Sequence, residues 1–138
     1  MADRDEVIVA LNRVAERAVV ALTFAVVANL VSAPSEGGTP VDTGWARANW
    51  VPAIGAPFKG VTGSRDSVSS AAQTTGQAEV LSYRLALGPV FVSNNVPYIL
   101  ALNDGHSKQA QPGFIERAID KAVFVDLARV DFSRLFAA

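Results

Sequence analysis

The only histidine of the chain is His106, so any chemistry that needs an imidazole must use it. Asp104 and Ser107 lie next to it in the sequence, and these residue types are those of a serine hydrolase. A Ser-His-Asp triad, however, is assembled by geometry from separated segments, and neighbours along one loop rarely meet in that arrangement. The chain also lacks cysteine, so no thiol nucleophile is available. We therefore predict no catalytic residue, and no enzyme, and interpret His106 as a solvated loop side chain.

Scattered carboxylates are the remaining candidates for a metal site. Asp42, Asp104, Glu116 and Asp120 have no second histidine or cysteine beside them, and their spacing matches no calcium loop. Glu116 and Asp120 are one helical turn apart among basic residues, which is typical of an exposed helix face. We predict no metal and no cofactor.

The sequence contains few features of a phosphate-binding or nucleic-acid-binding site. Residues 60–64 resemble a phosphate-binding loop only in composition, because the Gly-Lys-Ser/Thr ending is missing. The net charge is −1 and the isoelectric point is about 5.7, which does not suit a surface that neutralises phosphates. No basic stripe is interleaved with aromatic residues. We predict no specific nucleic-acid recognition, and a small nucleic-acid-binding module stays the alternative function.

Length and composition predict one domain over residues 1–138. Half of the residues are hydrophobic and 18% are charged, which is apolar for a soluble monomer. Met1 is followed by Ala-Asp-Arg-Asp-Glu and not by a basic and then an apolar run, so we predict no signal peptide.

A single long helix is predicted from Arg4 to about Val31. Its apolar stripe recurs at helical spacing: Val7, Leu11, Val14, Ala18, Leu22 and Ala25. From Ala18 to Val31 the helix is apolar on all sides, but this run is shorter than the roughly 18–20 residues of a bilayer span, so we predict no membrane segment. Such a helix must be covered on all sides. We favour a neighbouring subunit over purely internal burial, with Val20 and Val27 as the interface.

The next segments carry turn and strand signals. Residues 33–38 end the helix, residues 39–44 form a tight turn, and residues 45–54 alternate as a strand. Asp42 and Arg47 are either an inter-subunit contact or a structural turn beside a solvated strand face. We favour the structural interpretation, since surface ion pairs contribute only about 0–1 kcal/mol.

The secondary structure predicted for residues 55–92 and 124–136 is less well defined by the sequence. Residues 55–76 are rich in Gly, Ser, Thr and Ala, and we predict a mobile loop that either docks to a partner or is disordered. The pattern of residues 77–87 suits a helix or a strand. Residues 90–92 are predicted to form a short buried strand. The apolar period of residues 124–136 fits either a continuing helix or a terminal arm.

Prolines and glycines delimit two helices in the second half. Pro97 precedes a short helix over residues 98–102, and Gly105 stands where a left-handed stop is expected. After a polar loop, Pro112 begins a helix over about residues 113–128. Its predicted apolar face is Ile115, Ile119 and Ala122.

Two separated blocks carry a family resemblance. The first is Thr39-Pro40-Val41-Asp42-Thr43-Gly44, followed by Arg47 and Trp50. The second is Asn94-Asn95-Val96-Pro97-Tyr98, then Leu102-Asn103-Asp104-Gly105, Ser107-Lys108-Gln109-Ala110 and Pro112-Gly113. In this order, and at this separation, they resemble the tail-completion and neck proteins of tailed bacteriophages, over most of the chain up to about Val123. Asn103, where an acidic residue is commoner, and an inserted Gln111 depart from the family's pattern.

The resemblance implies a structural virion protein at the head–tail junction or at the end of the tail tube. It implies a ring of copies that contacts neighbouring neck or tail-tube proteins, after synthesis in the bacterial cytoplasm. It also favours a helix for residues 77–87. The expected fold is α+β, with a long N-terminal helix packed on a small antiparallel sheet and two or three shorter helices.

Overall fold

In the computed structural model, residues 3–41, 44–62 and 70–133 are described. The fold is α+β, as predicted, with one long helix, a two-stranded antiparallel sheet and several shorter helices. The main elements are α1 (Arg4–Val31), β1 (Val51–Ile54), α2 (Ala71–Val80), β2 (Val90–Ser93), α3 (Ile99–Asn103) and α4 (Phe114–Lys121).

Helix α1 has the predicted bounds because both of its ends are chemically defined. At the start, the Asp3 carboxylate accepts the backbone N–H of Glu6 at 2.9 Å, and Glu6 accepts that of Asp3 at 3.3 Å. This reciprocal pair is a capping box, which satisfies N–H groups that a helix start leaves open. At the other end, Thr39 donates its N–H and its hydroxyl to the carbonyl of Leu30, at 2.9 and 2.6 Å. The returning chain is thereby fixed to the last turn.

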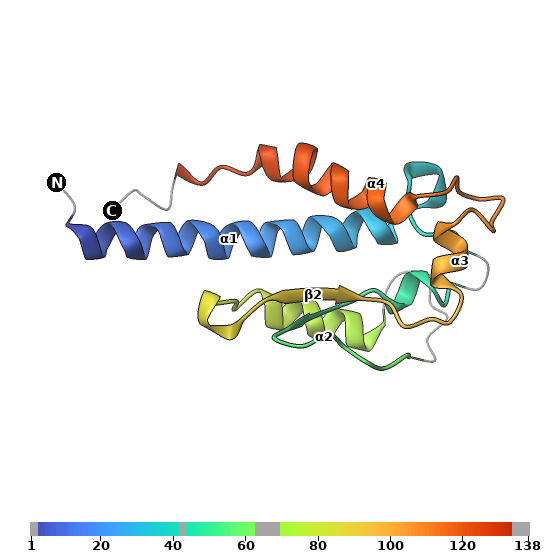
Figure 1. Ribbon diagram of the computed structural model, residues 1–138, viewed down its shortest axis with the longest axis horizontal. Coiled ribbons are helices and arrows are strands. Elements are labelled where there is room, and N and C mark those ends of the chain that lie inside the picture. The colour runs from blue at the N-terminus through green and yellow to red at the C-terminus, as the bar shows by residue number, and fades with distance from the viewer. Residues whose placement is uncertain (1–2, 42–43, 63–69, 134–138) are drawn as a thin grey trace.

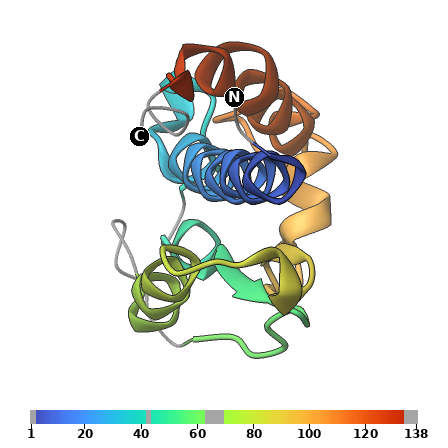
Figure 2. The same ribbon diagram turned by 90° about the vertical axis from the view of Figure 1, so that its left-hand side faces the viewer.

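The C-terminal half of α1 is the middle layer of the molecule. Helix α4 lies on one side of it and the sheet with α2 on the other (Figures 1 and 2). Thr23, Val27 and Leu30 are buried, and the amide of Asn29 donates to the Ala118 carbonyl at 3.1 Å in α4. Of residues 18–31, only Ala28 is exposed. The chain therefore covers this apolar half itself.

The predicted interface at Val20 and Val27 is wrong at Val27. Val27 is 1% exposed within one chain, so it belongs to the core and cannot face a second copy. Val20 is half-buried. The physical reason is that two layers of the same chain enclose α1 from opposite sides, whereas the sequence suggested cover from one side only.

By length and composition, α1 could cross a membrane. Its most apolar 18-residue window has a mean hydropathy of 1.8, and this window is longer than the apolar run on which the predicted exclusion rests. Core helices of soluble proteins have the same property. Only 22% of this window is buried within the chain, so the environment of a core helix applies to the C-terminal half of α1, which has layers on both sides, and not to its first turns.

The two strands pair antiparallel, with Val51 opposite Ser93 and Ile54 opposite Val90. The predicted strand at residues 90–92 is confirmed. The strand predicted over residues 45–54 is wrong in its first half, where Arg47–Asn49 is a 3-10 helix. Here the backbone N–H groups of Ala48 and Asn49 donate within the segment, to the carbonyls of Gly44 and Ala46 at 3.1 and 3.2 Å, and the Asn49 side chain donates to the Trp45 carbonyl at 2.8 Å. No neighbouring strand is needed to satisfy this segment.

Helix α2 lies partly inside the segment predicted to be a mobile loop. It begins after Ser70, whose hydroxyl accepts the N–H of Gln73 at 3.2 Å. Gly76 lies buried in the middle of the helix, where an added Cβ would approach the Pro52 carbonyl oxygen to 2.2 Å. The small residues of this segment thus allow close contact between α2 and β1. Residues 63–69 of the predicted loop lie outside the described residues.

The helix predicted for residues 77–87 is correct only up to Val80. The chain then turns, and a short 3-10 helix occupies Leu85–Leu87. The Tyr83 hydroxyl donates to the carbonyl of Gly88 at 2.6 Å and closes this turn toward β2.

The C-terminal helix starts after Gly113 and stays helical to Arg129, in agreement with the predicted 113–128. A π-helical turn at Ala122–Asp126 and a 3-10 turn at Leu127–Arg129 continue α4. The predicted apolar face is partly wrong, because Ile119 is 43% exposed. The buried face is Phe114, Ala118 and Ala122. Of the predicted continuation up to residue 136, residues 134–138 lie outside the described part.

Candidate assembly site

The two sequence blocks meet in space. The side-chain amide of Gln109 pairs with both backbone groups of Val41, 68 residues away: it accepts the Val41 N–H at 2.7 Å and donates to the Val41 carbonyl. A second link is the amide of Asn94, which donates to the Ala46 carbonyl at 2.8 Å. Asp42 and Thr43 lie outside the described residues, so the hypotheses about the Asp42–Arg47 pair stay untested. The rest of both blocks forms one structural unit.

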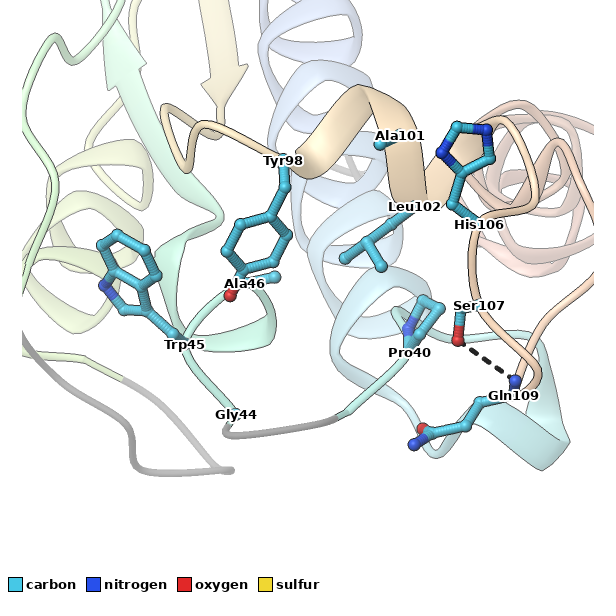
Figure 3. Close-up of a pocket in the computed structure, with 10 residues that line it drawn as sticks. All are labelled: Pro40, Gly44, Trp45, Ala46, Tyr98, Ala101, Leu102, His106, Ser107 and Gln109. Carbon is cyan, nitrogen blue, oxygen red and sulfur yellow. Dashed lines mark hydrogen bonds between the residues drawn. The ribbon is translucent and has the colours of Figure 1, made fainter.

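A cavity of about 510 Å³ lies between the blocks (Figure 3). The first block contributes Pro40, Gly44, Trp45 and Ala46, and the second Tyr98, Ala101, Leu102, His106, Ser107 and Gln109. Trp45 and Tyr98 form one side, with ring centroids 5.9 Å apart and planes inclined by 57°. The described part of the lining combines aromatic and aliphatic surface with hydroxyl, amide and imidazole groups, and no carboxylate is among these described residues.

The described side chains of the cavity do not form a catalytic arrangement. His106 is exposed, and the Ser107 hydroxyl accepts the N–H of Gln109 at 3.1 Å, so it shapes the loop. Among the residues that the structure describes, no group of three His, Asp or Glu side chains could hold a metal ion. The polar groups of the lining suit recognition of a surface better than chemistry.

Gly105 ends α3 in the left-handed conformation, with φ +95°, as predicted. A side chain there would meet two obstacles. The positive φ is unfavourable for other residues, and an added Cβ would lie 2.6 Å from Cγ of Pro112. Gly113, with φ +86°, is a second left-handed residue just before α4. Between them, the exposed Lys108 lies on the loop.

Asn103 connects the end of α3 to the start of α4. Its carbonyl accepts the N–H of Gly113 at 2.7 Å, and its side-chain oxygen accepts that of Ile115 at 2.9 Å. Its amide nitrogen donates to both carboxylate oxygens of Glu116 at 3.0 Å. This hydrogen bond is the main reason why the pKa of Glu116 is lowered. An aspartate at position 103 would keep the bond to Ile115 but repel Glu116, so this departure from the family's pattern is matched by its surroundings.

The inserted Gln111 is also held in place. The Arg117 guanidinium donates to the carbonyls of Gln111, at 3.1 Å, and Pro112. One side chain of α4 thereby fixes the segment that precedes its own helix. In the sequence, Asn103 stood out only as a departure from the family's pattern and Arg117 did not stand out, because both act on groups that only the fold brings near.

The remaining residues of the two blocks are buried, form hydrogen bonds or shape turns within the fold. Trp50 is buried, and its indole N–H donates to the Thr39 hydroxyl at 2.8 Å. Asn95 is exposed and donates to the carbonyls of Phe58 and Gly60, at 2.8 and 3.0 Å. Pro97 lies in the turn before α3. The Arg47 Nε is buried without a hydrogen-bond partner in the described structure.

Besides Tyr98 and Leu100 within the span of the second block, three groups of exposed apolar side chains lie outside these blocks. One group lies in the first turns of α1: Val7, Ile8, Val9 and Leu11. Another lies after α2: Leu81, Leu85 and Leu87. A third follows the outer side of α4 and its continuation: Ile119, Val123, Phe124 and Val125. Apolar surface of this kind marks association sites on soluble proteins.

Comparison of the chain with protein-family models, with curated proteins and with solved structures finds no match.

Proposed function

We propose that this chain is a structural virion protein of a tailed phage, a tail-completion or neck component at the head–tail junction or at the end of the tail tube. It acts there as a ring of identical copies and contacts neighbouring neck or tail-tube proteins. The observation that carries this proposal is the meeting of the two blocks. Residues that resemble one family in order and spacing lie around a common cavity, joined by Gln109 and Asn94.

The use made of the block residues supports a scaffold role. The side chains of Gln109, Asn94 and Asn103 form hydrogen bonds with backbone groups of distant segments. Gly105 supplies a backbone conformation and close contact with Pro112. Such residues fix the shape of a surface, and shape is what an assembly protein presents to its neighbours. The exposed apolar groups provide the surface for those contacts.

The mass of the purified protein in solution tests this proposal. Native mass spectrometry and negative-stain electron microscopy should show a closed ring of several copies, alone or after addition of tail tubes. Phage particles depleted of the protein should accumulate heads and tails that do not join. A chain that stays monomeric under both conditions, together with normal joining in depleted lysates, would contradict the proposed function.

A further inference from the structure

A basic cleft of about 450 Å³ lies between α1 and the segment after α2. Its lining includes Arg13, Arg17 and Arg84, and Glu16 is the only carboxylate among the described lining residues. Glu16 is already used, since it accepts the N–H of Leu85 at 2.9 Å and ties α1 to the neighbouring segment. The arginines outnumber the carboxylate, so the cleft is suited to a negatively charged occupant.

Apolar side chains border this cleft. Leu81 lies in the lining and is 60% exposed, and Leu85 and Leu87, which follow the lining residue Arg84 along the chain, are 40% and 53% exposed. Val20 contributes half-buried apolar surface to the lining. Three leucines left open beside three arginines indicate that the occupant is acidic and apolar at once. Free phosphate or a nucleic-acid backbone would leave the leucines uncovered.

The first turns of α1 have that complementary character. Three carboxylates and one cation, Asp3, Arg4, Asp5 and Glu6, leave this end acidic, and they precede four apolar residues that are each more than 40% exposed: Val7, Ile8, Val9 and Leu11. This end of α1 projects past the sheet layer (Figure 1). The stretch from Asp3 to Arg13 corresponds to about 15 Å of helix at 1.5 Å per residue. We call residues 3–11 the arm.

We propose that the arm of one copy docks in the basic cleft of a second copy. The carboxylates face the arginines and set the orientation, while the apolar side chains of the arm cover the leucine border. Burial supplies most of the affinity, because exposed ion pairs contribute little on their own. Arm and cleft are different surfaces, so the contact is head-to-tail, and repeated head-to-tail contacts close into a ring where the rotation allows it. Only this last step rests on the proposed function.

Charge reversal on each side tests the contact. The arm variant is Asp5→Lys, which leaves the Asp3–Glu6 capping box intact. The cleft variant is Arg17→Glu with Arg84→Glu. A matched control, Lys59→Glu with Arg129→Glu, reverses two exposed charges elsewhere. Circular dichroism checks that each variant is folded, and sedimentation velocity measures self-association at low and physiological salt.

Each one-sided variant should associate about tenfold more weakly than the unchanged chain, and the control should not. An equimolar mixture of the arm and cleft variants should regain association, because the unchanged arm of the cleft variant fits the unchanged cleft of the arm variant. One-sided variants that associate normally would overturn the proposal, and so would an unchanged chain that stays monomeric. A short DNA duplex that requires Arg17 and Arg84 for binding, while self-association does not, would show that the occupant is a polyanion.

The number of copies in the assembly distinguishes a failure of the arm–cleft contact from a failure of the proposed function. If rings form but survive the one-sided variants, the interface lies elsewhere and the proposed function stands. If the variants behave as expected but the assembly is a closed dimer, the contact is reciprocal and the ring function fails.

Discussion

The two halves of α1 share one apolar stripe, but they differ in how much of it is covered. In residues 18–31 only Ala28 is exposed, whereas Val7 and Leu11 in the first turns are 44% and 56% exposed. The apolar stripe runs through both halves, but the covering layers reach only one of them (Figure 1). A hydrophobic pattern therefore indicates that a helix face needs to be covered. It does not indicate whether the same chain or another copy covers that face, because this depends on the arrangement of the fold.

The largest expected difference between the two halves of α1 is in how their stability responds to an introduced charge. Val27→Asp should lower the free energy of unfolding by about 3–5 kcal/mol, because an unpaired charge would be buried where the valine is 1% exposed. Leu11→Asp in the open half should change it by less than about 0.5 kcal/mol. Urea denaturation of both variants measures the difference. Similar losses from the two variants would mean that the halves are equally buried.

The layer beneath the covered half depends on close contact at Gly76. Gly76→Val should destabilise the fold by about 1–3 kcal/mol, since even a Cβ there would collide with the Pro52 carbonyl. The exposed neighbour Thr75 provides the matched control, and Thr75→Ala should be nearly neutral. Thermal unfolding followed by circular dichroism compares them. A neutral Gly76→Val would show that α2 and β1 are not in this contact.

The connection between α3 and α4 should depend on backbone conformation more than on side-chain chemistry. Gly105→Val should cost about 1–3 kcal/mol, because a β-branched residue is strained at φ +95° and Pro112 leaves no room. Ser107→Ala, which removes one local hydrogen bond, should cost about 1 kcal/mol or less. Equal losses in urea denaturation would indicate instead that the loop is stabilised mainly by its polar side chains.

The smallest expected effect concerns Glu116 and pH. Its pKa is lowered from 4.5, chiefly by Asn103, so the ionised carboxylate stabilises the fold. A depressed pKa gives stability that is present above the unfolded pKa and lost as the pH falls through the folded value. Asn103→Ala should raise the pKa of Glu116 toward 4.5, as measured by NMR titration of the carboxyl carbon. An unchanged pKa would exclude Asn103 as the cause.

Local signals in the sequence predicted several elements well. The acidic residues before Val7 and the Gly- and Pro-rich stretch after Val31 mark both ends of α1, and β2 and the stop at Gly105 were equally clear. These features depend on neighbours along the chain. The helix face of α4 was ambiguous, because Ile115 with Ile119 and Phe114 with Ala118 share the same spacing.

Long-range contacts explain the errors. Gly76 suggested a loop by its residue type, although its role is contact with a proline of another element. The pairing of Gln109 with Val41 joins residues 68 positions apart, and no single sequence displays such a pairing. The resemblance placed both residues in the same site without indicating what joins them. Val27 was assigned to an interface because the second covering layer of α1 comes from the far end of the chain.

Hydrogen–deuterium exchange during self-association tests the central claim most directly. The claim is that the open first turns of α1 mediate contact between copies, while the covered half belongs to one chain. Comparison of dilute and concentrated protein should show slower exchange in residues 4–17 at high concentration and unchanged exchange in residues 18–31. Unchanged exchange in residues 4–17 of an associated sample, with new protection around the exposed Phe124, would contradict it.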